Sequence, residues 1–257
     1  MTPEFGTPRT AIVTGGAKRI GAAFVRALSA DGWHVLIHCR ESSAEAQALA
    51  AELGHARIVV ADLARAESAQ TVLDAAADMP PPALLVNSAS RFVHDSLDDF
   101  DVAGWEAHFA ANLRAPALLT QAFARAVPQR ARALIVNMLD AKLASPNPDF
   151  FSYTVSKMGF AGLTELSARA LAGRGIRVCG IAPSVTLVSG PQSRENFAQV
   201  HALNPLRRGV GVEELVAALR FLIATPSLTG QTILLDGGQR FLALPRDVQF
   251  LDAPGSA

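Results

Sequence analysis

The sequence predicts an α/β fold, a single doubly wound domain with helices on both faces of a parallel sheet of about seven strands. Short apolar stretches typical of buried strands alternate with longer helical stretches along the whole chain. The chain has 257 residues, 50% of them hydrophobic, and no repeat or low-complexity linker divides it. These observations favour one domain with a large core over two small ones.

The first half of the chain is expected to alternate between apolar strands and helices. The first two helices each run into a glycine, Gly32 or Gly54, and glycine can take the left-handed conformation that ends a helix. Strands are expected at residues 10–14, 33–39, 57–61 and 83–86, and helices at 21–30, 42–53 and 65–77.

The second half continues the alternation. Pro116 lacks an N–H and clashes with the carbonyl of Asn112, four residues back, so a helix through both should kink there. The freed carbonyl could hold a water that leads to Lys157, although an ordinary kink between two helices explains the proline equally well. Helices are expected at residues 99–127 and 151–172, and strands at 133–139, 176–181 and 232–235.

Three segments fall outside this pattern. Residues 1–9 are polar with two prolines and are expected to form a flexible arm before a domain that spans 10–244. Residues 245–257 form a polar, Pro-containing tail, except for 248–251, which could pack on a neighbour. Residues 184–209 are expected to close over a substrate as a lid, with a plain surface loop and short helix as the alternative.

Composition argues against several classes of function. The formal net charge is zero and the pI is about 7, which gives no electrostatic case for nucleic acid or an anionic membrane as the main partner. No apolar run is long enough to span a membrane, and the start does not resemble a signal peptide. Cys39 and Cys179 are expected to be buried thiols in a reducing cytoplasm, and the six histidines show no metal-ligand spacing.

Tyr153 and Lys157 lie four apart, so a helix places them one above the other on one face. Such pairs are common on helix surfaces, but Tyr153 is the only tyrosine and Lys157 is one of three lysines among 23 basic residues. An ammonium this close should lower the pKa of the phenol, which could then hand a proton to a substrate near neutral pH. Asp140 follows the strand expected at 133–139, where its carboxyl should face a crevice.

A glycine turn joins the first strand to the first helix. Gly15 and Gly21 come close to a dinucleotide-binding fingerprint, in which glycines let backbone N–H groups approach a pyrophosphate at a helix N-terminus. Lys18 adds positive charge on the same side.

The end of the second strand decides between the two nicotinamide cofactors. An NAD site has an acidic residue there, which accepts a hydrogen bond from the ribose 2′-OH. Here Arg40 can pair with a 2′-phosphate, with Ser42 and Ser43 nearby as donors. Glu41 is a competing signal, but one position later it should point away. We therefore expect NADPH as the cofactor.

Together these residues resemble the short-chain dehydrogenase/reductase family. Apolar helix faces around residues 115–127 and 151–170 would suit the two-fold interface of a homodimer, although they could equally cover the sheet. The family resemblance implies a single Rossmann-type domain, usually in a homotetramer. It also implies that Tyr153 donates the proton, Lys157 binds the nicotinamide ribose, Asn112 completes a proton relay and Asp62 holds the adenine. The motifs are Thr14-Gly15…Gly21, Asp62-Leu63, Asn87-Ser88-Ala89-Ser90, Asn112, Tyr153-x-x-x-Lys157 and Pro183; by the same resemblance the cofactor contacts extend to Ile20 and Ser184.

Two departures from the family pattern resemble its pteridine reductase branch. Arg19 replaces the middle glycine of the first turn, and Asp140 replaces the usual catalytic serine. The branch implies that Ser90 contacts cofactor phosphate and pterin, that Phe92 stacks the pterin against the nicotinamide, and that Arg19 reaches both cofactor and substrate. Leu187 and Val188 of the expected lid would meet the substrate.

The resulting hypothesis is NADPH-dependent reduction of a pterin, with Asp140, Tyr153 and Lys157 handling protons. Asp140 could supply a proton only if protonated or relaying one, so desolvation should raise its pKa. One alternative is a reductase of ordinary ketones such as 3-oxoacyl or sugar carbonyls. Asp140 argues against it, because an unprotonated carboxylate is a poor hydrogen-bond donor to an oxyanion. Another is an NADPH-binding module without catalysis, against which the intact Tyr153 and Lys157 argue.

Overall fold

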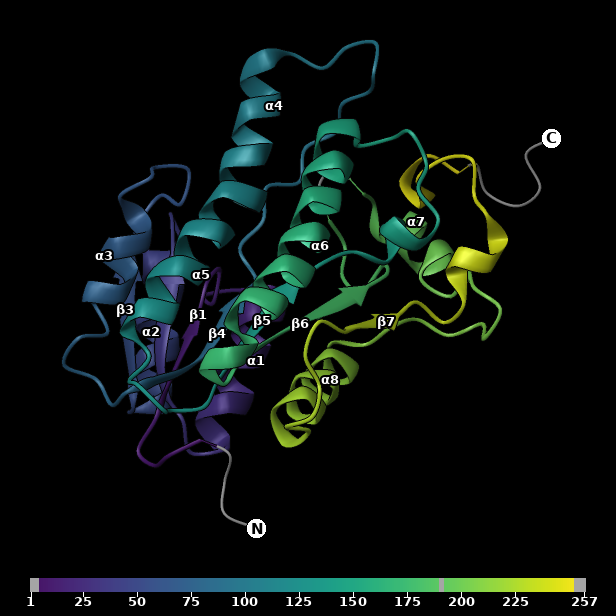
Figure 1. Ribbon diagram of the computed structural model, residues 1–257. Helices are drawn as coiled ribbons and strands as arrows, with labels where there is room; N and C mark the ends of the chain where they lie inside the picture. Colours follow the sequence, from purple (N-terminus) through teal and green to yellow (C-terminus); the bar gives the residue numbers. More distant parts are fainter. Residues whose placement is uncertain (1–4, 190–191, 252–257) are drawn as a thin grey trace.

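The structure, a computed structural model, describes residues 5–189 and 192–251. One sheet of seven parallel strands runs through the molecule in the order β3-β2-β1-β4-β5-β6-β7 (Figure 1). This confirms the predicted fold class. The strands are β1 (Thr10–Val13), β2 (His34–Cys39), β3 (Ala56–Val60), β4 (Pro82–Asn87), β5 (Ala133–Met138), β6 (Ile176–Pro183) and β7 (Thr232–Leu235).

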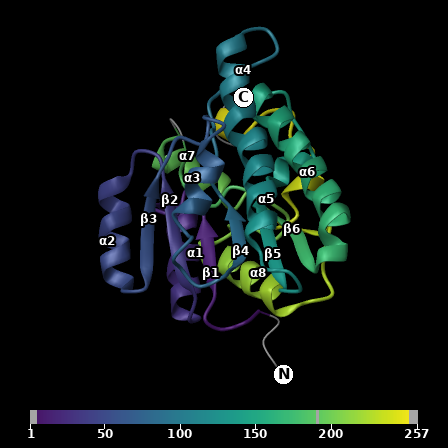
Figure 2. The same ribbon diagram turned by 60° about the vertical axis from the view of Figure 1, so that its left-hand side comes forward.

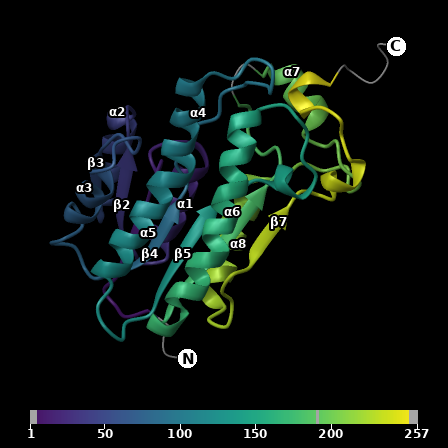
Figure 3. The same cartoon turned by 45° about the horizontal axis from the view of Figure 1, so that its top comes forward.

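Helices cover both faces of the sheet. Apolar side chains of α1, α2 and α8 pack on one face, and those of α3, α5 and α6 pack on the other. Figure 2 shows α2 beside β3 at one edge of the sheet, and Figure 3 shows α4, α5 and α6 together on one side. The helices are α1 (Arg19–Ala30), α2 (Ser43–Leu53), α3 (Ser68–Asp74), α4 (Val102–Phe109), α5 (Ala115–Ala126), α6 (Phe151–Leu171), α7 (Arg194–Val200) and α8 (Val212–Ala224).

The central strands are largely apolar because both of their faces are covered. Every residue of β1 and β5 is buried. Each fully buried Val, Leu or Ile side chain contributes about 1.5–3 kcal/mol, so the strands anchor the core. The chain passes from β1 outward to β3 and then returns to place β4 on the other side of β1. Parallel sheets bind ligands at such a reversal, beyond the carboxyl ends of the strands.

The helices differ from the expected ones in three places. The helix expected at 65–77 is confined to α3 (Ser68–Asp74). The helix expected at 99–127 is divided into α4 and α5 by a π-helical segment, Ala110–Arg114, which contains Asn112; this confirms an interruption there. The sequence interpretation omitted α8, although Leu215, Leu219 and Leu222 have helical spacing and are buried.

The two ends of the described chain also differ from expectation. Phe5 is 3% exposed and its ring centroid lies 5.6 Å from that of Trp33, so the expected loose arm is anchored to the domain at Phe5, whereas residues 6–8 are exposed. Residues 1–4 lie outside the described residues. The tail packs on its own chain: Val248 is buried, and α7 and Val248–Phe250 are in contact (Figures 1 and 3).

Three further features concern the described residues. None of their helices is long and apolar enough to cross a membrane. No group of three or more His, Cys, Asp or Glu among them could hold a metal ion. Cys39 and Cys179 are buried and free, as expected.

Candidate active site

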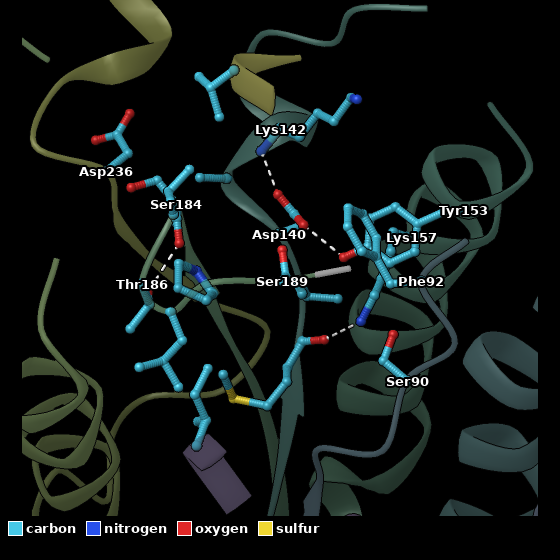
Figure 4. A pocket seen from close by; sticks show the side chains of 18 of the residues that line it. Ser90, Phe92, Asp140, Lys142, Tyr153, Lys157, Ser184, Thr186, Ser189 and Asp236 are labelled. Atoms are coloured by element: carbon cyan, nitrogen blue, oxygen red, sulfur yellow. Dashed lines mark hydrogen bonds between the residues drawn. The ribbon is translucent and has the colours of Figure 1, made fainter. Parts of the chain in front are cut away.

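A cavity of about 660 Å³ opens where β1, β4, β5 and β6 end (Figure 4). Most of the predicted site residues line it, although they come from segments far apart in the sequence. They are Gly15, Lys18, Arg19, Ile20, Gly21, Ser88, Ala89, Ser90, Phe92, Asp140, Tyr153, Lys157, Pro183, Ser184 and Leu187.

Asp140, Tyr153 and Lys157 meet on one side of this cavity. The Tyr153 hydroxyl donates to Asp140 Oδ2 at 2.6 Å, and Lys157 Nζ donates to the carbonyl of Met138 at 2.7 Å (Figure 4). The ammonium lies 5.6 Å from the centroid of the Tyr153 ring. The structure thus brings the predicted trio together.

Local structure explains this convergence. Helix α6 begins at Phe151, so Tyr153 lies in its first turn and Lys157 one turn later on the same face. Strand β5 ends at Met138, whose carbonyl accepts from Lys157. Asp140 has an extended backbone, and its Oδ1 accepts from the N–H of Lys142 at 2.8 Å. One carboxyl oxygen is therefore held by backbone and the other by the phenol.

Burial and the contacts among the three side chains shift the pKa values of Asp140, Tyr153 and Lys157. Burial raises the pKa of Asp140, as expected from the sequence. The expected lowering of the Tyr153 pKa is wrong here: burial and the nearby Asp140 carboxyl raise it well above the ordinary value. Asp140, not Lys157, is the group that touches the phenol. Burial lowers the pKa of Lys157 to about 8, against the opposing charge of Asp140.

The turn after β1 requires glycine at two of its positions, Gly15 and Gly21. A Cβ on Gly21 would lie 2.1 Å from the carbonyl oxygen of Gly15, and one on Gly15 would lie 3.0 Å from the Cα of Ala89. Gly15 also has a φ of 63°, which disfavours other residues. The turn leads directly into the N-terminus of α1 at Arg19. Backbone N–H groups can thus approach an anionic ligand closely.

Sequence reasoning missed His38, which supports this turn. The N–H of Gly15 lies 3.3 Å from His38 Nδ1, and His38 Nε2 lies 3.0 Å from the carbonyl of Ala61. Burial lowers the pKa of His38, although the Ala61 hydrogen bond opposes this. A neutral ring with Nε2 protonated satisfies both contacts. The only signal in the sequence was a polar residue within an apolar strand.

Arg19 occupies the position of the family's middle glycine at a cost in backbone strain. Its φ is 55°, in the left-handed region that side chains disfavour. Its Nη1 donates to the carbonyl of Val188 at 2.7 Å. The contact ties the first turn to the expected lid; the predicted Val188 contributes this carbonyl and does not line the cavity.

Phe92 lines the cavity and belongs to an aromatic cluster. Its ring stacks on Phe150 with centroids 4.1 Å apart, and it meets the Tyr153 ring edge-on at 4.7 Å. These contacts fix the orientation of Phe92 beside the Tyr153 ring.

Asn112 lies behind the cavity wall rather than in it. Its side chain is 1% exposed, accepts from the N–H of Arg91 at 2.7 Å, and donates to the carbonyl of Arg91 and to Ser156 Oγ. Ser90 Oγ donates to Asn112 Oδ1 at 3.2 Å. Asn112 therefore positions the segment after β4, and its part in a proton relay stays a prediction.

Several predicted cofactor residues lie outside this cavity. Arg40 pairs with Glu41 at 2.8 Å, so Glu41 does not point away as expected. Both side chains are exposed, and such pairs are worth about 0–1 kcal/mol, too little to keep the guanidinium from a phosphate. The residues outside the cavity are Arg40, Ser42, Asp62, Leu63, Asn87, Asn112 and Val188.

Sequence reasoning also missed the far wall of the cavity. Lys142, Asp247 and Gln249 line it, and none was predicted as a site residue. One indication in the sequence that Lys142 could belong to the site is that it is one of only three lysines in the chain. Asp247 and Gln249 carried none, because their place depends on contacts with segments distant in sequence.

Comparisons with known proteins place the chain in a family. The family model described as short chain dehydrogenase matches residues 9–198. The chain belongs to this family. The matched range includes the glycine turn, Tyr153 and Lys157.

The names of individual relatives of this short-chain dehydrogenase indicate different substrates. The FolM alternative dihydrofolate reductase 1 from Brucella suis, crystallised with NADP, is 39% identical, with a TM-score of 0.87 over 90% of this chain and 95% of that one. Pteridine reductase 1 from Leishmania tarentolae is 30% identical, covering 90% of this chain and 96% of its own length. A 3-oxoacyl-[acyl-carrier-protein] reductase from Synechocystis sp. is also 30% identical, covering 90% and 97%.

Proposed function

We propose that this chain is an NADPH-dependent reductase of a pterin. The observation that carries the proposal is the hydrogen bond from the Tyr153 hydroxyl to the Asp140 carboxyl, 2.6 Å long, beside Phe92 in the cavity. The similarity to FolM and to pteridine reductase 1 supports it. The similarity to the 3-oxoacyl reductase favours a ketone reductase as the second candidate.

The residues present fit a nicotinamide dinucleotide phosphate. The close contacts of Gly15 and Gly21 leave room only for hydrogen at their Cα atoms, as a turn that admits a pyrophosphate requires. The N–H groups of this turn and Lys18 would hold the phosphates, and Arg40 and Ser42 would hold the 2′-phosphate. Asp62 and Leu63 would lie at the adenine. When bound, the cofactor supplies a hydride.

The chain's own residues would manage the proton. Reduction of a ring C=N needs a proton at nitrogen, and the raised pKa of Asp140 lets its carboxyl hold one closer to neutral pH than an exposed aspartate could. Tyr153 donates to Asp140 and can pass on a proton in a second reduction. Lys157 would bind the nicotinamide ribose and keep a positive charge beside the phenol. A flat pterin stacked on Phe92 would gain about 0.5–1.5 kcal/mol.

A panel of substrates tests this proposal. NADPH oxidation is measured with oxidised and dihydro pterins, with 3-oxoacyl thioesters and with sugar ketones, and with NADH in place of NADPH as a control. We expect turnover with pterins and NADPH. Turnover of ketones alone would replace the proposal with the second candidate, and NADPH binding without any turnover would favour a non-catalytic module.

Arg40→Ala should raise KM for NADPH by about tenfold or more, because a charge-assisted hydrogen bond to a phosphate is worth about 1.5–3 kcal/mol. KM for NADH should stay unchanged, since NADH has no 2′-phosphate. Steady-state kinetics with both cofactors measures the effect. Arg26→Ala, which removes another exposed arginine paired with a glutamate, is the matched control.

The rate should depend on pH through Lys157. A lysine with a lowered pKa loses its charge at a lower pH, so the ammonium is present below pH 8 or so and absent above it. Because kcat/KM reports the free enzyme, kcat/KM for the pterin should fall as pH rises through this value. A pH series in buffers of constant ionic strength measures it. A rate that rises through the same range would contradict the role of Lys157.

We also propose a cytoplasmic homotetramer or homodimer. Met158 and Leu166 on α6 are 44% and 67% exposed, and an apolar helix face of this kind suits a two-fold interface. Light scattering in solution tests the assembly.

A further inference from the structure

A buried carboxylate outside the catalytic trio holds the C-terminal tail against the cavity. Asp149 is 4% exposed and lies between β5 and α6. Its oxygens accept from Arg246 Nε at 3.0 and 2.8 Å, and one of them accepts from the N–H of Asp247 at 2.7 Å. Burial raises the pKa of Asp149, but these donors outweigh it and hold the pKa below the ordinary value. Asp149 is therefore a carboxylate at neutral pH.

The anchored tail closes over Lys142, the neighbour of the catalytic aspartate. Lys142 Nζ donates to the carbonyl of Asp149 at 2.6 Å and to Asp247 Oδ2 at 3.2 Å. The side chains of Lys142 and Asp247 are only 9% and 15% exposed. The backbone N–H of the same lysine donates to Asp140 (Figure 4). Lys142 thus links the tail to Asp140, with its ammonium bonded to Asp247 and its backbone N–H bonded to Asp140.

Aromatic contacts continue from the tail to the ring that would stack on a pterin. Phe250 stacks on Phe150 with centroids 5.8 Å apart, and Phe150 stacks on Phe92 at 4.1 Å. His94 meets both Phe150 and Phe250 edge-on. The position of the tail therefore affects the orientation of Phe92 as well as that of Asp140.

The part of the cavity wall that the tail helps to form contains buried side-chain oxygens that accept no hydrogen bond. Asn147 belongs to the loop before α6, Gln192 to the expected lid and Gln249 to the tail, and all three line the cavity. The side-chain oxygen of each is buried and has no hydrogen-bond partner within the described part of the chain. Buried acceptors are normally satisfied, so this set indicates a ligand that donates hydrogen bonds. The amide nitrogens of Gln192 and Gln249 already donate to Asn196 and Ser189.

We propose that Asp149 is a positioning residue that anchors the chain's own tail as the outer wall of the substrate site. In this site Asn147, Gln192 and Gln249 accept hydrogen bonds from N–H or O–H groups of the bound substrate. The identity of that substrate rests on the proposed function, whereas the anchor does not. Release of the tail should weaken substrate binding and spare NADPH binding, because the cofactor turn is packed on Ala89 and held by His38.

Asp149→Asn tests the anchor, since it keeps the size of the side chain and removes its charge. We expect KM for the substrate found in the panel to rise by about tenfold, as for the loss of a charged hydrogen bond, with KM for NADPH unchanged. Asp149→Glu should restore part of the affinity. Asp78→Asn, which breaks an exposed carboxylate–arginine pair, is the matched control.

Limited proteolysis reports on the tail without any need for turnover. Trypsin cleaves after arginine, and the bond after Arg246 should be cut slowly in the native protein and much faster in Asp149→Asn. If that variant does not fold, Arg246→Gln, at a half-exposed position, replaces it. Because this substitution removes the tryptic site, cleavage after Phe250 by chymotrypsin is then compared between Arg246→Gln and the native protein. Slow cleavage in both variants would overturn the anchor, and fast cleavage with unchanged KM for substrate would overturn the wall. A native chain inactive on pterins would refute the proposed function while the tryptic result still decides the anchor.

Discussion

Asp140→Ser is expected to lower kcat/KM for pterin reduction by about a thousandfold, within the range that one general acid contributes. The carboxyl lines the cavity, accepts from the Tyr153 hydroxyl and has a raised pKa, so it can carry the proton that a ring nitrogen needs. Serine can donate a hydrogen bond but cannot release a proton near neutral pH. Steady-state kinetics with a dihydropterin and NADPH measures the loss.

The specificity of this loss matters as much as its size. The Kd for NADPH should stay close to that of the native protein, because the cofactor turn lies on β1 and α1 and not on β5. Asp78→Ser, at an exposed position, controls for the loss of a carboxylate. Pterin turnover that is unchanged in Asp140→Ser would refute the assignment of the acid.

Lys157→Met is expected to lower kcat by about a hundredfold or more, since electrostatic stabilisation by one fixed charge reaches that size. Lys157 is 3% exposed and is the cation of the trio, with its Nζ 5.6 Å from the Tyr153 ring. Methionine fills a similar volume without the charge. NADPH binding should weaken too, because the ammonium is expected to hold the nicotinamide ribose.

The same variant separates catalysis from stability. In the folded chain the pKa of Lys157 is lowered from 10.5 to about 8, so the folded state binds this proton less tightly than the unfolded state. The charged lysine therefore destabilises the fold below pH 8, and this cost disappears as pH approaches 10.5. At neutral pH the melting temperature of Lys157→Met should stay near that of the native protein or rise, with Lys18→Met as an exposed control. A large fall in melting temperature would show a structural role for Lys157 instead.

Local patterns were sufficient to predict the sheet and the convergence of Asp140, Tyr153 and Lys157 at the cavity. Tyr153 and Lys157 are brought together by helical spacing alone, and Asp140 follows a strand whose apolar run was evident. The glycines of the first turn likewise act through neighbours close in the chain or at adjacent strand ends. Such features depend on spacing, which a sequence records directly.

Features that depend on distant contacts were not predicted. Asp149 and Arg246 are 97 residues apart, and nothing in either neighbourhood indicates the pairing. The expected direction of the Tyr153 pKa shift was wrong because burial of the phenol and its contact with the Asp140 carboxyl both raise the pKa, and only the fold decides either of them. Helix α8 is different: its spacing was present in the sequence and was overlooked.

A crystal structure with NADP⁺ and a dihydropterin bound tests the central claim most directly. The account predicts the pterin ring stacked on Phe92, with the Asp140 carboxyl in hydrogen-bond contact with a ring nitrogen and the Tyr153 hydroxyl facing the nicotinamide. A pterin bound elsewhere, or a Tyr153 hydroxyl turned away from the nicotinamide, would contradict it.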